Sequence, residues 1–188
     1  YQGRPTGLEW AFEREAYIVK AGYFFESDLQ GNNKGDTAAA RVAWTPFKQA
    51  GNVLHRGVSA TREKPDSEVN GLGVTVYPSA RWRAKPEASL TAVRLVDSGT
   101  LTRVDHIDRS GLEALWIHGA WSVQGEYLHQ KTSRDLGLPS YAADGAYVSG
   151  SWLVTGESRA YSAGNVSNPK PKGKYGAVEL LARYSRID

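Results

Sequence analysis

The stretch Leu112-Glu-Ala-Leu-Trp-Ile-His-Gly-Ala-Trp-Ser-Val-Gln-Gly-Glu-Tyr127 decides the fold class of this chain. Apolar side chains recur at every second position, first at Leu112, Ala114 and Trp116, and again after a turn near Gly119. Successive side chains of a β-strand point to opposite faces, so this period of two predicts a strand on each side of the turn. The stretch therefore predicts an antiparallel β-hairpin.

The same period continues outward from this hairpin toward both ends of the chain. It predicts further strands over residues 8–13, 17–25, 38–45, 53–63, 73–83, 90–96, 146–154 and 178–184. Polar, Gly-rich or Pro-rich loops are expected over residues 29–37, 64–71, 131–144 and 156–174. Sustained helical periodicity is absent, so we expect an all-β fold with nine or ten antiparallel strands, most of them about eight to twelve residues long.

The composition leaves two kinds of β protein open. The chain has 188 residues, a formal charge of +3, no Cys and no Met, which argues against a disulfide framework and against a nucleic-acid tail. Apolar runs fall short of the roughly 18 residues that a membrane-spanning helix needs. A mean hydropathy of −0.48 fits a soluble protein, and it equally fits a membrane barrel, in which apolar and polar residues alternate.

Two features favour the membrane barrel. One face mixes glycine with large side chains, as in Val123-x-Gly125-x-Tyr127, and lipid fills around a glycine where a soluble core would keep a void. Trp and Tyr also recur near strand ends, where interfacial belts place them; these residues are Trp10, Tyr17, Trp44, Trp116, Trp121, Tyr127, Trp152, Tyr175 and Tyr184. Because aromatic residues are common in all β-sheets, a soluble barrel stays open as the alternative.

The segment Arg81-Trp82-Arg83-Ala84-Lys85 places a cation at every second position. In an extended chain the three cations share one face, with rungs about 6–7 Å apart. On an open surface such a ladder is an ordinary charged strand face. Inside a closed barrel it is an anion path, in which a phosphate ion passes from rung to rung and always contacts one.

Other clusters give weaker signals. Asp105-His106-Ile107-Asp108 has metal-binding residue types, but three polar groups in a loop are more often solvated. The carboxylates of Glu113, Glu126 and Glu179 suggest a hydrolytic pair, yet the wet lumen of a membrane barrel explains them as well. We therefore expect no catalytic residue, no metal and no cofactor.

Several blocks together resemble the phosphate-selective porin O and P family. The resemblance covers most of residues 38–188, and its most specific blocks lie near the end of the chain. The blocks are Ala40-Arg-Val-Ala-Trp-Thr-Pro46, Arg81-Trp-Arg-Ala-Lys-Pro-Glu87, Arg94-Leu-Val-Asp97, Trp121-Ser-Val-Gln-Gly-Glu-Tyr-Leu128, Trp152-Leu-Val-Thr-Gly-Glu-Ser-Arg159 and Gly176-Ala-Val-Glu-Leu-Leu-Ala-Arg-Tyr-Ser185.

The resemblance implies a sixteen-stranded, homotrimeric antiparallel transmembrane β-barrel in a bacterial outer membrane, in contact with lipid, that conducts phosphate or polyphosphate. It places Arg81, Arg83 and Lys85 on the family's luminal ladder, where Lys85 keeps the charge but loses the bidentate grip of arginine. It also implies pore-lining roles for Arg94 and Lys131.

On this interpretation residues 1–188 form one barrel segment that is incomplete at both ends. Two alternatives remain: a soluble β-barrel that binds a small anionic ligand, and a barrel hydrolase, for which no Ser/His/Asp set is evident.

Overall fold

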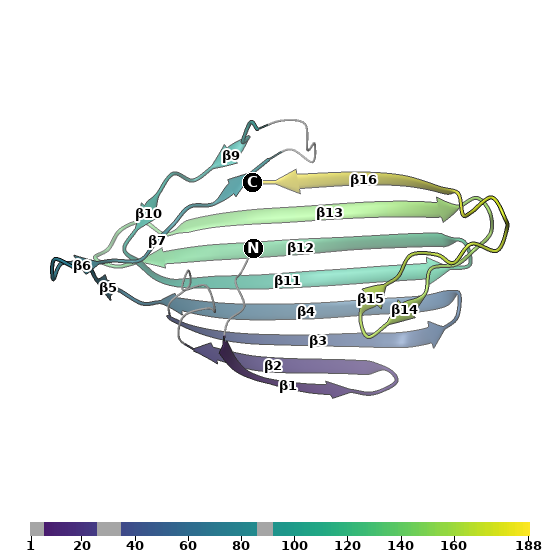
Figure 1. Cartoon of the computed structure of the whole chain (residues 1–188), viewed down its shortest axis with the longest axis horizontal. Helices are drawn as coiled ribbons and strands as arrows, with labels where there is room; N and C mark the ends of the chain where they lie inside the picture. The colour runs from purple at the N-terminus through teal and green to yellow at the C-terminus, as the bar shows by residue number, and fades with distance from the viewer. Residues whose placement is uncertain (1–5, 26–34, 86–91) are drawn as a thin grey trace.

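The computed structural model describes residues 6–25, 35–85 and 92–188. Its centre is an antiparallel sheet of eight strands in the order β1-β2-β3-β4-β11-β12-β13-β16 (Figure 1). The strands are β1 (Thr6–Glu13), β2 (Tyr17–Phe25), β3 (Gly35–Gln49), β4 (Asn52–Pro65), β11 (Val104–His118), β12 (Trp121–Arg134), β13 (Tyr141–Leu153) and β16 (Glu179–Ile187). The described residues contain no helix, and therefore none that crosses a membrane. The all-β, antiparallel prediction is confirmed.

The sheet has eight strands where the sequence predicted nine or ten, because the chain leaves the sheet between β4 and β11. The expected strands over 73–83 and 90–96 are wrong: their described residues form only two-residue strands and connections. These short strands are β5 (Glu68–Val69) with β6 (Thr75–Val76), β7 (Ser79–Ala80) with β10 (Leu101–Thr102), and β8 (Arg83–Ala84) with β9 (Val96–Asp97). Pro78 lies directly before β7 and has no N–H for a ladder hydrogen bond, which is one reason why no long strand forms here.

The edges of the predicted loops also move. The expected loop over 131–144 shrinks because β12 continues to Arg134 and β13 begins at Tyr141, and the expected loop over 29–37 lies mostly outside the described residues.

Connections at one end of the sheet are mostly short. Tight turns join β1 to β2, β3 to β4 and β11 to β12, the last through Gly119 with a φ of 57°. Two long connections depart from the sheet. We call residues 66–103, between β4 and β11, the first excursion, and residues 154–178, between β13 and β16, the second excursion; the second contains β14 (Tyr161–Ser162) and β15 (Asn165–Val166). Figure 1 shows them at opposite ends of the sheet.

Both excursions pack on the same face of the sheet, which we call the inner face. Tyr161 and Val166 of the second excursion cover buried Ile117 and its neighbours, while Trp82 of the first packs against the cluster around buried Ile107. The opposite, outer face exposes most of the large apolar side chains of the strands, among them Trp10, Val42, Trp44, Val58, Leu112, Trp116, Trp121, Val148, Trp152 and Tyr184. This inverted arrangement is that of a membrane barrel, and a soluble barrel would bury those side chains.

Candidate anion path

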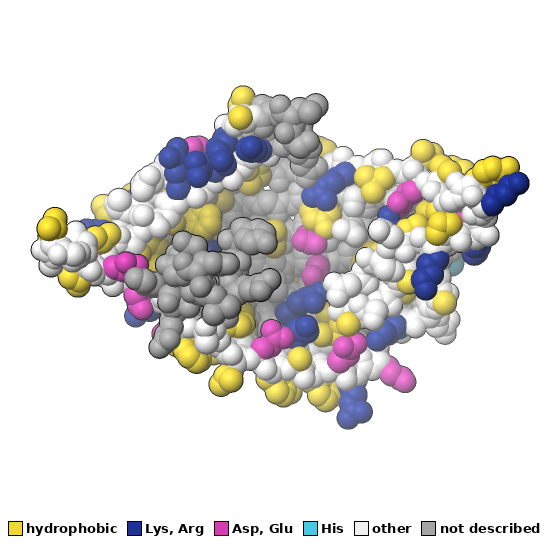
Figure 2. Space-filling model, in the orientation of Figure 1, with side chains coloured by type: hydrophobic (Ala, Val, Ile, Leu, Met, Phe, Trp, Pro, Cys, Tyr) yellow, Lys and Arg dark blue, Asp and Glu magenta, His cyan; other side chains and the backbone are white. Residues whose placement is uncertain are grey.

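The cations of the first excursion share one side of a β-ribbon. From Arg81 to Lys85 the exposure alternates: Arg81, Arg83 and Lys85 are exposed, while Trp82 and Ala84 are half-buried. The spacing predicted this common side. The ladder lies on the β8–β9 ribbon rather than on a strand of the large sheet, and Figure 2 shows Lys and Arg side chains gathered over β7 to β9.

The apolar side of the ribbon fixes it to the sheet. The indole Nε1 of Trp82 donates a hydrogen bond of 3.0 Å to the hydroxyl of Thr132 on β12, which is fully buried. The backbone N–H of Trp82 donates to the hydroxyl of Ser98 at 2.9 Å. With Trp82 turned toward the sheet, the cations on the other side of the ribbon remain accessible to solutes.

The cations of the ribbon differ in their partners. Arg81 makes a bidentate ion pair with Asp97, at 2.8 and 2.6 Å, and hydrogen bonding from this guanidinium lowers the pKa of Asp97 to about 2. Arg83 lies opposite Asp97 in the β8–β9 register but makes no ion pair within the described residues. Lys85 and Arg94 are exposed and likewise unpaired in that part of the chain. The cations without an ion pair in this part of the described chain are therefore Arg83, Lys85 and Arg94.

Lys131 does not join this group. Its neighbour Thr132 faces inward, where it meets Trp82, so Lys131 on β12 faces outward. There it lies level with Asp108, which pairs with Arg62 at 2.7 Å. The sequence analysis missed this because it placed residue 131 in a loop, whereas β12 continues to Arg134 and its even-numbered residues from Ser122 onward belong to the inner face.

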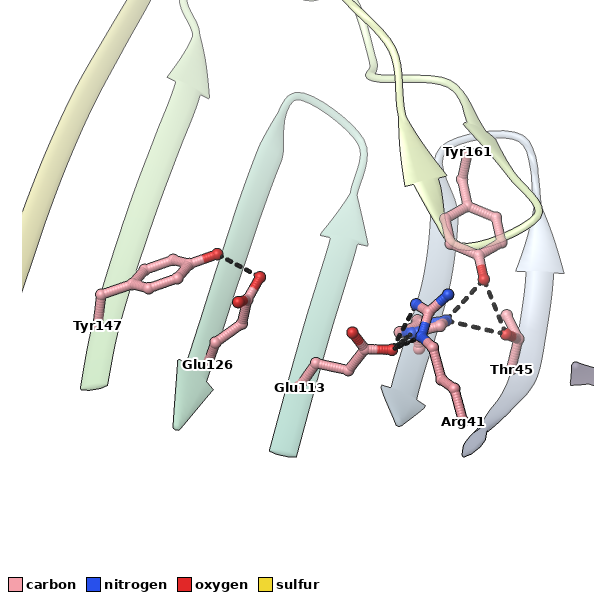
Figure 3. Close-up of polar contacts among 7 residues, drawn as sticks. Arg41, Thr45, Glu113, Glu126, Tyr147 and Tyr161 are labelled. Carbon is pink, nitrogen blue, oxygen red and sulfur yellow. Dashed lines mark hydrogen bonds and ion pairs between the residues drawn. The ribbon is translucent and has the colours of Figure 1, made fainter. Parts of the chain in front are cut away.

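A second polar cluster lies on the inner face beneath the second excursion (Figure 3). Glu113 on β11 accepts hydrogen bonds from Arg41 on β3, at 2.9 and 2.5 Å, and lies 3.0 Å from the Nε2 of His55 on β4. The Nδ1 of His55 is 2.6 Å from the hydroxyl of Tyr161, which also bonds to Thr45 at 3.0 Å. The sequence pointed to Glu113 alone, because its partners are far away along the chain.

Two further guanidiniums near the inner face have carboxylate partners. Arg109 lies 2.8 Å from Glu63, and Arg159 of the second excursion lies 2.5 Å from Glu179. Glu63, Glu113 and Glu179 are thus engaged in ion pairs, and Glu126 accepts a hydrogen bond from Tyr147. This use explains them without a hydrolytic pair.

His106, in the Asp105-His106-Ile107-Asp108 segment, has acidic partners. His106 lies 2.7 Å from Asp105 and 3.4 Å from Asp108. Among the described residues no group of three or more acidic or imidazole side chains is arranged to hold a metal ion.

Comparisons with known proteins agree with this geometry. The chain is 30% identical over 169 residues to Porin O of Pseudomonas aeruginosa, an alignment that covers 78% of this chain and 36% of that protein. It is 25% identical over 202 residues to an uncharacterized protein of Caulobacter vibrioides, covering 98% of this chain and 39% of that protein. The chain spans less than two-fifths of the length of either relative. The family description "Phosphate-selective porin O and P" matches residues 1–188. The chain therefore belongs to the phosphate-selective porin O and P family of the outer membrane, an antiparallel β-barrel family.

Proposed function

We propose that this chain forms part of an outer-membrane channel that conducts anions, with phosphate or polyphosphate preferred, and that it carries out no catalysis. The unpaired cations of the first excursion carry the proposal. Arg83, Lys85 and Arg94 keep their charge while Arg41, Arg109 and Arg159 are neutralised by neighbouring carboxylates. An anion in the enclosed space therefore meets its strongest attraction at the ribbon.

The mechanism follows from spacing and exposure. Exposed cations at alternate positions lie about 6–7 Å apart, so a phosphate ion that leaves Lys85 already meets Arg83. The planar fork of Arg83 matches two phosphate oxygens, and exposure to water keeps each contact weak enough for release. Arg81 contributes less, because Asp97 occupies its guanidinium.

The open edges of the sheet support the proposal that it belongs to a larger barrel. Within the described residues β1 pairs only with β2, and β16 only with β13, so the sheet is open at both edges. A membrane tolerates no open sheet edge, since unpaired backbone N–H and C=O groups are costly in lipid. We therefore propose that these eight strands belong to a closed barrel of sixteen strands, assembled as a homotrimer in contact with outer-membrane lipid.

The test is single-channel recording of the full-length protein in a planar bilayer, with chloride as the current carrier and inorganic phosphate added in steps. We expect phosphate to block the chloride current. Arg83→Ala should raise the half-blocking phosphate concentration about tenfold, since a hydrogen-bonded ion pair contributes about 1.5–3 kcal/mol.

The matched control is Lys131→Ala, which removes an equal charge from the outer face and should leave the block unchanged. Equal effects of Arg83→Ala and Lys131→Ala would contradict the proposed path. A protein that stays in solution without detergent and never inserts would instead favour the soluble anion-binding barrel.

A further inference from the structure

Lys20 on β2 is a half-buried cation on the inner face of the sheet. The β2–β3 register places it directly opposite Arg41, so the two side chains lie on the same face. Arg41 points away toward Glu113 on β11 and is paired with it (Figure 3). Lys20 makes no ion pair within the described residues. Like charges directly opposite each other destabilise a sheet, and an anion bound beside Lys20 would remove that cost.

A pocket of about 180 Å³ lies beside Lys20 on this face. Gly22, Ala39 and Thr61 follow one another across β2, β3 and β4, and all three line it. Two of these positions have at most a methyl group as a side chain, which leaves the space above them open. The volume exceeds that of several water molecules, at about 30 Å³ each, so it also accommodates a phosphate ion.

Two hydroxyl groups of β4 line the same pocket. Ser59 lies opposite Arg41 in the register, and Thr61 lies opposite Ala39. The hydroxyl oxygen of Thr61 is buried and has no hydrogen-bond partner in the described part of the chain. A buried polar group without a partner is costly, and an oxyanion can accept the hydrogen bond that this hydroxyl leaves unmade.

The remaining walls keep an anion from being held tightly. Glu9 on β1 lies opposite Gly22 and lines the pocket with a carboxylate, and Phe24 contributes an apolar wall. The negative charge of Glu9 weakens the attraction that Lys20 exerts on an anion. A site on a conduction path must release its ion, so weak binding suits this position.

We propose that Lys20, Ser59 and Thr61 form a second phosphate site on the wall of the channel, separate from the cation ribbon. Lys20 supplies the charge, and the two hydroxyls donate hydrogen bonds to phosphate oxygens. The inference rests on the proposed anion path and deepens it, because it adds a binding site on the sheet itself to the cations of the first excursion.

The experiment measures block of chloride current by inorganic phosphate in single channels of the full-length protein. Lys20→Gln should raise the half-blocking phosphate concentration about fivefold, and Lys20→Arg, which keeps the charge, should restore the block. Thr61→Val keeps the shape and deletes the hydroxyl. It should raise the half-blocking concentration about threefold and leave the chloride conductance without phosphate unchanged.

Two matched controls test the location of the site. Lys131→Gln removes an equal charge from the outer face and should leave the block unchanged. Thr37→Val deletes a hydroxyl on the inner face of β3, outside the pocket lining, and should also leave it unchanged. Wild-type block in Lys20→Gln, or equal effects of Thr61→Val and Thr37→Val, would overturn the inference.

The failure of this site is distinguishable from that of the anion path. If Arg83→Ala weakens the block and Lys20→Gln does not, the path stands and the second site fails. If phosphate does not block the wild-type channel, the path fails, and calorimetric titration of the detergent-solubilised protein with phosphate tests the site alone. Binding heat that Lys20→Gln removes would support the site, whereas no heat, or heat that persists in Lys20→Gln, would overturn it.

Discussion

The two excursions differ in how they use their charged side chains. The second excursion is fastened to the sheet by satisfied polar groups: Arg159 pairs with Glu179, and Tyr161 bonds to His55 and Thr45. The first excursion is fastened through the indole of Trp82 and leaves Arg83 unpaired. In the first excursion the anchoring side chain, Trp82, and the unpaired cation, Arg83, are therefore different residues, whereas the polar groups named in the second excursion all serve as anchors.

The physical reason lies in the cost of an unpaired charge. A guanidinium packed against the sheet needs a carboxylate, because desolvation without a partner is expensive. A guanidinium on the exposed side of a ribbon keeps its water and can remain unpaired, so it is available to a passing anion. The comparison teaches that the position of a carboxylate, rather than residue type or exposure alone, separates a paired cation from an unpaired one, since Arg81 and Arg83 are both exposed and only Arg81 has an ion pair within the described residues.

The largest effect is expected from Glu113→Gln, which removes the carboxylate shared by Arg41 and His55. With side-chain exposures of 29% for Arg41 and 28% for Glu113, the variant leaves a partly buried guanidinium without its counter-charge. We expect a loss of about 2 kcal/mol in the free energy of unfolding. A lower midpoint of thermal unfolding, followed by circular dichroism in detergent, measures it.

Glu9→Gln is the control for this variant, because Glu9 is exposed on β1 and makes no ion pair within the described residues. Glu113→Gln also releases the guanidinium of Arg41, so the variant should strengthen phosphate block. Unchanged stability together with unchanged phosphate block in Glu113→Gln would contradict the role given to Glu113.

A smaller effect is expected from Tyr161→Phe, which keeps the ring and deletes the hydroxyl that reaches His55 and Thr45. Loss of these hydrogen bonds should weaken docking of the second excursion by about 1 kcal/mol. Faster limited proteolysis within residues 154–178 is the measurement. Tyr175→Phe alters an 89% exposed tyrosine of the same excursion and should not change the cleavage rate; equal acceleration in both variants would rule out the anchoring role of Tyr161.

The smallest effect is expected from Asp97→Asn, which releases Arg81 in the first excursion. Exposed ion pairs are weak, so one more free cation should strengthen phosphate block only about threefold. Because the pKa of Asp97 is lowered to about 2, wild-type Asp97 is ionised at neutral pH, and the pair is lost only as the pH falls from the ordinary value of 3.8 through about 2.

Single-channel recording at neutral pH gives the comparison for Asp97→Asn, with the exposed loop residue changed in Asp135→Asn as its control. Weaker block in Asp97→Asn would mean that Asp97 orients Arg81 for phosphate rather than occupying it.

Much of the sheet could be predicted from local pattern, but the difference between the ladder cations could not. Arg81 and Arg83 have the same residue type and the same alternation, and only the β8–β9 pairing brings Asp97 to Arg81. The side of Lys131 could not be predicted either, because the local pattern indicated a loop from residue 131; only the continuation of β12 to Arg134, with Thr132 facing Trp82, places Lys131 on the outer face. The strands expected over 73–83 and 90–96 failed because local β propensity does not decide whether a segment stays in a large sheet.

The sequence by itself determined the all-β class, the hairpin around Gly119, the alternation of faces and the common side of Arg81, Arg83 and Lys85, because the period of two is a local property of an extended chain. The tertiary structure decided which charges are neutralised. It brings Glu113 to Arg41 across 72 positions and His55 to Tyr161 across 106. Such contacts depend on strand register and on where an excursion packs, and neither is encoded in the spacing of neighbouring residues.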